Sequence, residues 1–184
     1  MSPIKLIMIL TVTVIIAQTP TIHDAFIWDR IAIESGQWWR IITGNLTHTN
    51  LEHLAINLSG LVVLYFFHGH YYDHKLLVPI VLMMLAIGIA MLLSPFDWYA
   101  GLSGVLYGLF AWGCVRDIKN NASCGKVLLA GVVIKLGIDS YTGGNAITEA
   151  LINAGVAYQA HWIGIVVGLV CAITLSCRGE SSTD

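Results

Sequence analysis

The sequence predicts an all-α membrane protein, and its composition and the arrangement of its apolar residues both indicate this fold class. Hydrophobic residues make up 57% of the 184 residues, and charged residues make up only 11%, whereas roughly a quarter of the residues in a soluble domain are charged. The mean hydropathy is +0.76. The apolar residues fall in several long runs, which is typical of a chain that crosses a bilayer several times. A soluble enzyme is excluded.

Six segments come close to the roughly 20 apolar residues that a helix needs to cross a bilayer. The fifth is the weakest, because Lys126 and Lys135 interrupt it. The first could instead be a secretory signal, but its end lacks the usual small-residue cleavage pattern, so we expect a retained span. In chain order, the predicted spans are residues 4–19, 48–67, 76–93, 99–115, 122–138 and 156–177.

The distribution of Lys and Arg predicts an orientation with both termini in the cytoplasm, because short cytoplasmic loops carry an excess of these residues. This gives a six-helix bundle, N-in and C-in, in which residues 1–178 form one membrane domain and residues 179–184 a short hydrophilic tail. Lys135 falls near the outer end of the fifth span. The inner cations are Lys5, Lys75, Arg116, Lys119, Lys126 and Arg178, and the outer ones are Arg30 and Arg40.

Charge and cysteine usage exclude several kinds of ligand. The formal net charge is -2 and no cluster of Lys or Arg is present, which excludes nucleic acid and leaves the lipid bilayer as the surrounding partner. The His-rich loop at residues 68–74 lies on the predicted cytoplasmic side, away from the polar residues described below, so we expect no metal and no cofactor. Cys114, Cys124, Cys171 and Cys177 lack metal-binding spacing and fall near the reducing cytoplasmic face, which indicates free thiols.

Strongly polar side chains are costly inside a bilayer, so those in the predicted spans are candidate functional residues. His53 and Asn57 are four residues apart and therefore lie on one face of the second span. His48 lies about one turn earlier, near the outer surface. Hydrogen bonding between helices is the alternative role for such residues, and this pair alone does not decide between the two roles.

The fourth span begins with a glycine-rich turn that contains a serine. Ser103 falls in the first turn, where free backbone N–H groups and the positive end of the helix dipole favour a developing anion. Gly101, Gly104 and Gly108 allow another backbone to come close, which by itself is more typical of helix packing than of catalysis.

The sixth span carries His161, with Gly164 and Gly168 on the same helix face. This smooth stripe favours close packing against the glycine-rich fourth span, which would bring His161 toward Ser103 and Tyr107. A serine hydroxyl becomes a good nucleophile when an adjacent imidazole takes its proton. Because no Asp or Glu falls inside a predicted span where it could orient His161, we expect a Ser-His dyad rather than a triad.

Three further side chains fit this chemistry. Tyr107 can stack on the His161 ring and fix its orientation, although filling space is an equally good account of it. The oxyanion of a tetrahedral intermediate needs preorganised hydrogen-bond donors. The side chains of His53 and Asn57, together with the backbone N–H of Ser103, can supply them.

These residues together resemble the rhomboid family of intramembrane serine proteases. The matching motifs are Trp39-Arg40 in the first outer loop, H-x-x-x-x-H-x-x-x-N from His48 to Asn57, G-x-S-G from Gly101 to Gly104 with Tyr107, and A-H-x-x-G-x-x-x-G from Ala160 to Gly168.

The resemblance implies a role for each of these residues. Ser103 would be the nucleophile and His161 the base, with His53, Asn57 and the Ser103 amide as oxyanion donors. His48, Tyr107 and the two glycines of the G-x-S-G motif, Gly101 and Gly104, would support them. The resemblance also implies a six-helix bundle with a water-filled cavity open to the outer face, a movable fifth span as a side gate, and an outer loop anchored by Arg40 through backbone carbonyls or headgroups.

The short chain and the sequence WRIITGN at residues 39–45 are similar to the rhombosortase branch of the family. That branch implies the inner membrane of a Gram-negative bacterium, with the active site open to the periplasmic side. Its substrates would be exported proteins with a C-terminal membrane helix, cut beside a glycine-rich junction.

Two other functions compete with proteolysis. A catalytically inactive rhomboid-like protein that binds membrane clients is the main alternative, but such proteins typically lose the serine or the histidine, and both are present here. A transporter or channel predicts charged residues in several spans and internal symmetry, and the sequence has neither.

Overall fold

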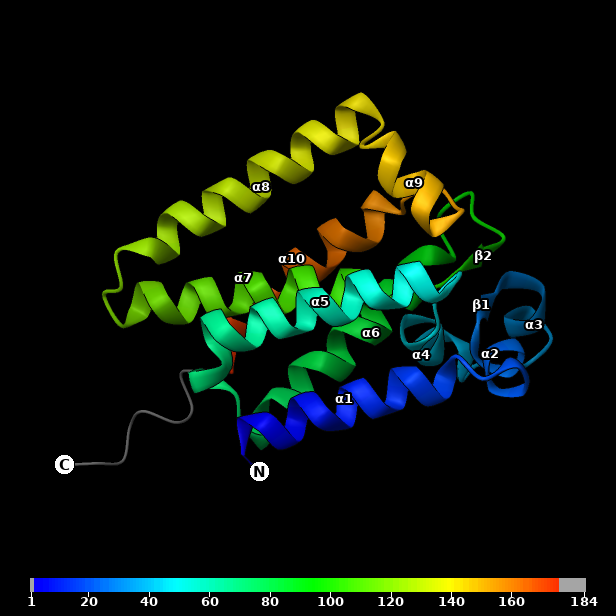
Figure 1. Ribbon diagram of the computed structural model, residues 1–184, viewed down its shortest axis with the longest axis horizontal. Coiled ribbons are helices and arrows are strands. Elements are labelled where there is room, and N and C mark those ends of the chain that lie inside the picture. The colour runs from blue at the N-terminus through cyan, green and yellow to red at the C-terminus, as the bar shows by residue number, and fades with distance from the viewer. Residues whose placement is uncertain (1, 176–184) are drawn as a thin grey trace.

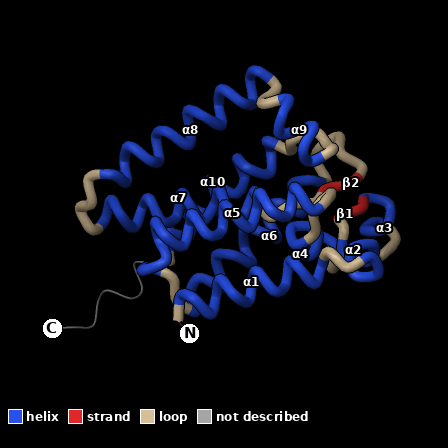
Figure 2. Tube along the Cα trace, viewed as in Figure 1, coloured by secondary structure: helices blue, strands red, loops and turns tan. Residues whose placement is uncertain are grey.

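The computed structural model of the chain describes residues 2–175, and its regular structure is almost entirely helical (Figures 1 and 2). Each of the six predicted segments overlaps one long helix. Long apolar runs favour helices in a bilayer because a helix satisfies its own backbone polar groups. The long helices are α1 (Pro3–Ala17), α5 (Leu51–His68), α6 (Leu77–Met91), α7 (Ser103–Lys119), α8 (Cys124–Thr142) and α10 (Tyr158–Thr174).

Short elements connect these helices, and most of them gather at one end of the bundle. There β1 (Trp28–Asp29) pairs with β2 (Trp98–Tyr99) in a two-stranded antiparallel sheet, drawn in red in Figure 2. Arg30 fastens this end to α6 by donating to four backbone carbonyls between Met91 and Phe96. The other short elements are α2 (Pro20–Phe26), α3 (Arg30–Glu34), α4 (Arg40–Thr43), α9 (Ala146–Ile152) and the 3-10 turns η1 (Gly44–Leu46), η2 (Gly69–Tyr71) and η3 (His74–Leu76).

Two helical segments are long and apolar enough to cross a membrane, Leu51–Tyr71 and His74–Met91. Two sharply bent helix pairs, α1 with α2 and α8 with α9, pass the same test if each pair is taken as one span. Residues 2–175 therefore contain two to four candidate membrane spans, as expected for an integral membrane protein. The six-span count and the N-in, C-in orientation remain predictions.

At the centre of the bundle, α7 contacts α5, α6, α8 and α10. Its contact with α10 is the most extensive between any two elements of the described chain. Glycines make this possible: a Cβ added at Gly164 would collide with the carbonyl of Gly104, and one at Gly168 with the carbonyl of Gly108. The predicted packing of the fourth span on the sixth is confirmed.

By contrast, α8 is the least enclosed of the long helices. Of its 19 residues, only Gly125 and Leu136 are buried, and Figure 1 shows it rising away from α7 toward the turn into α9. The helix continues beyond residue 138, the end of the fifth predicted span, to Thr142 and so includes Asp139.

The end of α7 also differs from the prediction. The helix continues beyond residue 115 to Lys119 and buries Asp117. The Asp117 carboxylate accepts a hydrogen bond from the Tyr71 hydroxyl at 2.9 Å and lies 3.2 Å from the ring of His68. These partners offset part of the cost of burying a carboxylate.

Three of the four cysteines can be checked. Cys114, Cys124 and Cys171 are free, which confirms the prediction for these residues. Cys177, the end of the sixth predicted span and the tail at 179–184 lie outside the described residues.

Candidate active site

Ser103 is the first residue of α7, and the turn before it fixes its position. Gly101 has a φ of +140°, which side chains with a Cβ rarely adopt. Its N–H donates to the carbonyl of Gly44 at 3.2 Å, and its carbonyl accepts from the Tyr99 hydroxyl at 2.8 Å. The turn therefore holds Ser103 with the first N–H groups of α7 unused by the helix.

The side chain of His161, one turn into α10, reaches this serine. Ser103 Oγ lies 2.8 Å from His161 Nε2, a hydrogen-bond distance that allows proton transfer. The histidine is only 7% exposed. The packing between α7 and α10 explains the closeness, because a Cβ at Gly104 would lie 2.8 Å from the carbonyl of Ala160, the residue just before His161.

Two tyrosine rings hold the imidazole of His161. Tyr107 stacks on it with ring centroids 4.4 Å apart and planes 18° apart, which agrees with the predicted stacking. Tyr158 contacts the same ring edge-on at 6.0 Å. The imidazole is thus oriented by aromatic contacts, and its Nδ1 atom is buried with no hydrogen-bond partner in the described chain.

His53 and Asn57 lie near Ser103 from the α5 side. A Cβ at Gly101 would be 3.1 Å from His53 Nε2 and 3.8 Å from Ser103 Oγ, so the imidazole of His53 lies beside the serine. The backbone N–H of Thr49 lies 3.4 Å from His53 Nδ1 and the Thr49 hydroxyl lies 3.1 Å from the same nitrogen, so Thr49 fixes the orientation of the ring. Asn57 uses one amide hydrogen on the carbonyl of His53 at 3.0 Å and is 3% exposed.

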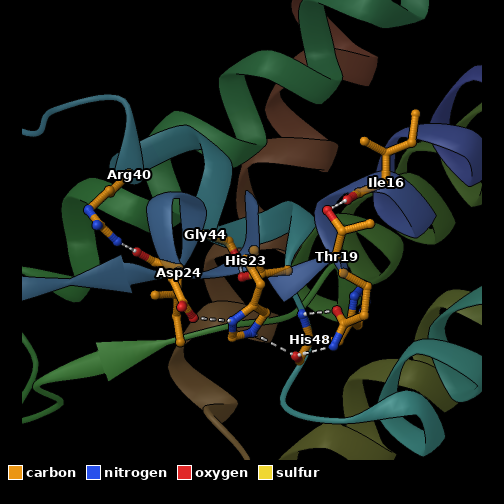
Figure 3. Close-up of polar contacts among 10 residues, drawn as sticks. Ile16, Thr19, His23, Asp24, Arg40, Gly44 and His48 are labelled. Atoms are coloured by element: carbon orange, nitrogen blue, oxygen red, sulfur yellow. Dashed lines mark hydrogen bonds and ion pairs between the residues drawn. The ribbon is translucent and has the colours of Figure 1, made fainter. Parts of the chain in front are cut away.

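His48 lies behind His53 and does not line the cavity. The two rings meet edge-on with centroids 5.0 Å apart, so His48 supports the position of His53. The carbonyl of His48 accepts from Gln18 Nε2 at 2.9 Å and lies 3.1 Å from the ring of His23 (Figure 3).

Arg40 anchors the first loop through protein groups. Its guanidinium donates to the carbonyl of Ile27 at 2.7 Å (Figure 3). It also donates to the side chain of Gln37 at 2.7 Å. The residue is 8% exposed. Of the two expected anchors, backbone carbonyls and lipid headgroups, the structure has the first.

Two hollows meet at Ser103. The first is a cavity of about 290 Å³ that contains His53, Ser103 and His161 and is covered by residues 152–157 of the loop after α9. The second is an apolar groove of about 650 Å³ between α5, α7 and α8, lined by Asn57, Ser103 and Tyr107 among mostly aliphatic side chains. The serine hydroxyl can therefore be approached from a polar cavity and from the side of the bundle.

The sequence reasoning missed two residues of this site. Thr49 orients His53 and also donates its hydroxyl to the carbonyl of Ile152, which fastens the covering loop. Tyr158 is the second aromatic contact of His161. The position of Tyr158, three residues before His161 on α10, is a signal that could have revealed it. No such local signal exists for Thr49.

The arrangement supports acyl transfer by a serine and a histidine, with donors for an oxyanion nearby. In residues 2–175, no group of three or more His, Cys, Asp or Glu side chains is placed to hold a metal ion. A comparison with known protein families matches the Rhomboid domain over residues 35–178, which is most of the chain. A comparison with curated proteins finds no match.

Proposed function

The chain belongs to the rhomboid family of intramembrane serine proteases, and we propose that Ser103 and His161 are its catalytic dyad. The observation that carries this proposal is the 2.8 Å contact between Ser103 Oγ and His161 Nε2. It occurs at the point where the polar cavity meets the lateral groove. A serine and a base at hydrogen-bond distance in such a place can attack a peptide bond.

In the proposed reaction, Ser103 Oγ attacks the carbonyl carbon of the scissile peptide bond while His161 Nε2 takes its proton. The oxyanion accepts hydrogen bonds from the Ser103 backbone N–H, His53 Nε2–H and the remaining amide hydrogen of Asn57. The protonated His161 then gives its proton to the leaving amine, and the C–N bond breaks. Water from the cavity, deprotonated by His161, hydrolyses the acyl-enzyme and releases Ser103.

The groove between α5 and α8 is the proposed path of the substrate. A membrane helix approaching from the lipid meets an apolar surface that matches its own side chains. Regular helical hydrogen bonding shields backbone carbonyls, so the substrate must unwind locally before it is cut. Glycine lowers this cost by roughly 1 kcal/mol per residue relative to alanine, which favours glycine-rich junctions.

The rhombosortase branch is the proposed subfamily. It places the protein in the inner membrane of a Gram-negative bacterium with six spans, both termini in the cytoplasm and the active site open to the periplasm. Residues 1–178 act as one membrane domain. The substrates are exported proteins with a C-terminal membrane helix behind a glycine-rich junction. The alternative, an inactive protein that binds membrane clients, is disfavoured by the close contact between Ser103 and His161.

Reconstitution into lipid vesicles with a single-span substrate tests this function. Ser103→Ala and His161→Ala should each lower kcat by at least about 10³-fold, because nucleophile and base act as a unit. Ser59→Ala, which removes an exposed hydroxyl from α5, is the matched control and should leave the rate unchanged. Replacing the glycines of the substrate junction by leucines should abolish cleavage.

Each part of this experiment has an outcome that would contradict one of the proposals. Full cleavage by Ser103→Ala would refute the dyad. Equal cleavage of the leucine-substituted substrate would refute the rhombosortase specificity without affecting the dyad. A native protein that binds several cognate substrates but cuts none would establish the inactive alternative.

A further inference from the structure

One charged pair lies close to the catalytic residues and has no part in the proposed reaction. Lys135 and Asp139 are one turn apart on α8 and form an ion pair. Lys135 also lines the apolar groove that contains Ser103 and Tyr107. Ionisable residues inside a membrane span are costly and are functional candidates by default.

The pair is not arranged for the greatest helix stability. The more stabilising order places the acid before the base along the helix, whereas here Lys135 precedes Asp139. The carboxylate also lies in the last turn of α8, which ends at Thr142, where the negative end of the helix dipole disfavours an anion. The pair therefore needs another explanation.

The packing of α8 on α10 brings this segment beside His161. The Ser140 hydroxyl accepts a hydrogen bond from Trp162 Nε1 at 3.0 Å, so the residue after Asp139 contacts the residue after His161. One turn earlier, the buried side chain of Leu136 packs in a cluster with Tyr107 and Tyr158, the two tyrosines that contact the imidazole. The side chain of Asp139 is 25% exposed and that of Lys135 is 62% exposed.

The pair is connected to His161 through Tyr107. Lys135 lines the groove together with Tyr107, whose ring stacks on the imidazole, and Asp139 is paired with Lys135. The other polar side chains around the imidazole are His53 of α5 and the hydroxyls of Ser103 and Tyr158. The buried Nδ1 of His161 has no partner in the described chain, so no adjacent carboxylate neutralises the ring when it gains a proton.

We propose that Asp139 is a positioning residue for the proposed dyad: its carboxylate stabilises the positive charge that His161 gains from Ser103, and Lys135 opposes this effect. The inference rests on the proposed function and adds to it a carboxylate that acts across a helix interface instead of through a direct hydrogen bond.

The test compares removal of either charge. In vesicles, kcat and KM are measured from pH 5 to pH 9 for the native protein, Asp139→Asn and Lys135→Gln. Protonation of His161 inactivates the base, so its protonation sets the acidic limb of the profile. Asp139→Asn should move the midpoint of this limb to lower pH by roughly 0.5 to 1 unit and lower kcat several-fold. Lys135→Gln should move the midpoint to higher pH by a similar amount.

The opposite signs separate this role from a structural one, because both variants break the same ion pair. Lys126→Gln removes a cation from the same helix but outside both hollows and serves as the matched control, with no shift expected. Shifts of the same sign for both variants, or no shift for either, would overturn the proposal.

A second readout separates failure of this inference from failure of the proposed function. NMR titration of ¹⁵N-labelled histidines, with the ring of His161 assigned through His161→Gln, follows the same protonation without a substrate. Opposite shifts in this titration would support the electrostatic role even if the protein cleaved nothing. Equal titration of His161 in all variants would refute it even in an active protease.

Discussion

Two of the helices that pack on α7, α10 and α8, differ sharply in how closely they approach it. On the α10 side, glycines on both helices let backbone meet backbone, and a Cβ at Gly164 or Gly168 would collide with a carbonyl of α7. On the α8 side, the helix comes this close at its first turn, where a Cβ at Gly125 would lie 2.8 Å from the carbonyl of Cys114; farther along, a Cβ at Gly131 or Gly137 would meet nothing within 4 Å. Figure 1 shows α8 rising away from α7 after this first turn.

Glycine spacing explains this contrast. Gly164 and Gly168 are four residues apart and share one face of α10, whereas Gly131 and Gly137 are six apart and point in different directions around α8. The close interface fixes the distance between Ser103 and His161. The open interface leaves the lateral groove. A protease that takes helices from the membrane needs both a rigid pair of catalytic groups and a side through which substrate can pass.

The largest effect is expected at the proposed oxyanion donors, which α5 places beside Ser103. His53→Ala should lower kcat by about 10²- to 10³-fold, because a preorganised donor is lost in a site sheltered from water. His70→Ala, a change of the same type at an exposed histidine in η2, should have no effect. The measurement is the rate of cleavage in vesicles with thermal unfolding as a check on folding. A His53→Ala protein that is folded and fully active would remove His53 from the mechanism.

A smaller effect is expected from adding one methyl group to each interface. Gly164→Ala should destabilise the fold by about 1–3 kcal/mol, because α10 must move away from α7, and activity should fall as the dyad separates. Gly137→Ala makes the same change in open space on α8 and should stabilise the helix by up to about 1 kcal/mol. Unfolding of both variants in the same detergent compares the two directly. Equal destabilisation by both would contradict the contrast between the interfaces.

The sequence predicts the interface between α7 and α10 far better than the end and the contacts of α8. The apolar runs locate the six long helices, and the glycine spacing on the fourth and sixth spans predicts the approach of His161 to Ser103, because both signals are local and periodic. The end of α8 beyond Ile138 is not predicted, since Asp139 is an unlikely residue inside a span. The contact of Thr49 with Ile152 joins residues 103 positions apart, and no local pattern encodes it.

The outer loop illustrates the same limit. Trp39-Arg40 is recognisable as a motif, but the partners of Arg40, the carbonyl of Ile27 and the side chain of Gln37, depend on how the chain folds back at one end of the bundle. His48 is recognisable in the same way, yet its ring supports His53 and does not line the cavity. A motif therefore identifies residues whose exact contacts only the tertiary structure supplies.

The smallest effect is expected at the hydrogen bond that joins α8 to α10. The hydrogen bond from Trp162 Nε1 to Ser140 Oγ joins α10 to α8 at 3.0 Å, and a single bond of this type contributes about 0.5–1.5 kcal/mol. Trp162→Phe and Ser140→Ala should each loosen α8 and raise kcat/KM for a membrane-spanning substrate by a few-fold. Labelling of Ser103 by a small soluble fluorophosphonate should stay unchanged, since that probe needs only the polar cavity.

The double variant and a matched control decide whether this bond closes the groove. Because both changes break one bond, the double variant should gain no more than either single variant. Thr142→Val removes a hydroxyl whose bond, to the carbonyl of Ile138, lies within α8, and it should leave cleavage unaffected. A rise in both cleavage and labelling would mean that loosening α8 alters the dyad itself. In that case the interface with α10 would not hold the catalytic groups independently of the groove beside α8 that admits substrate.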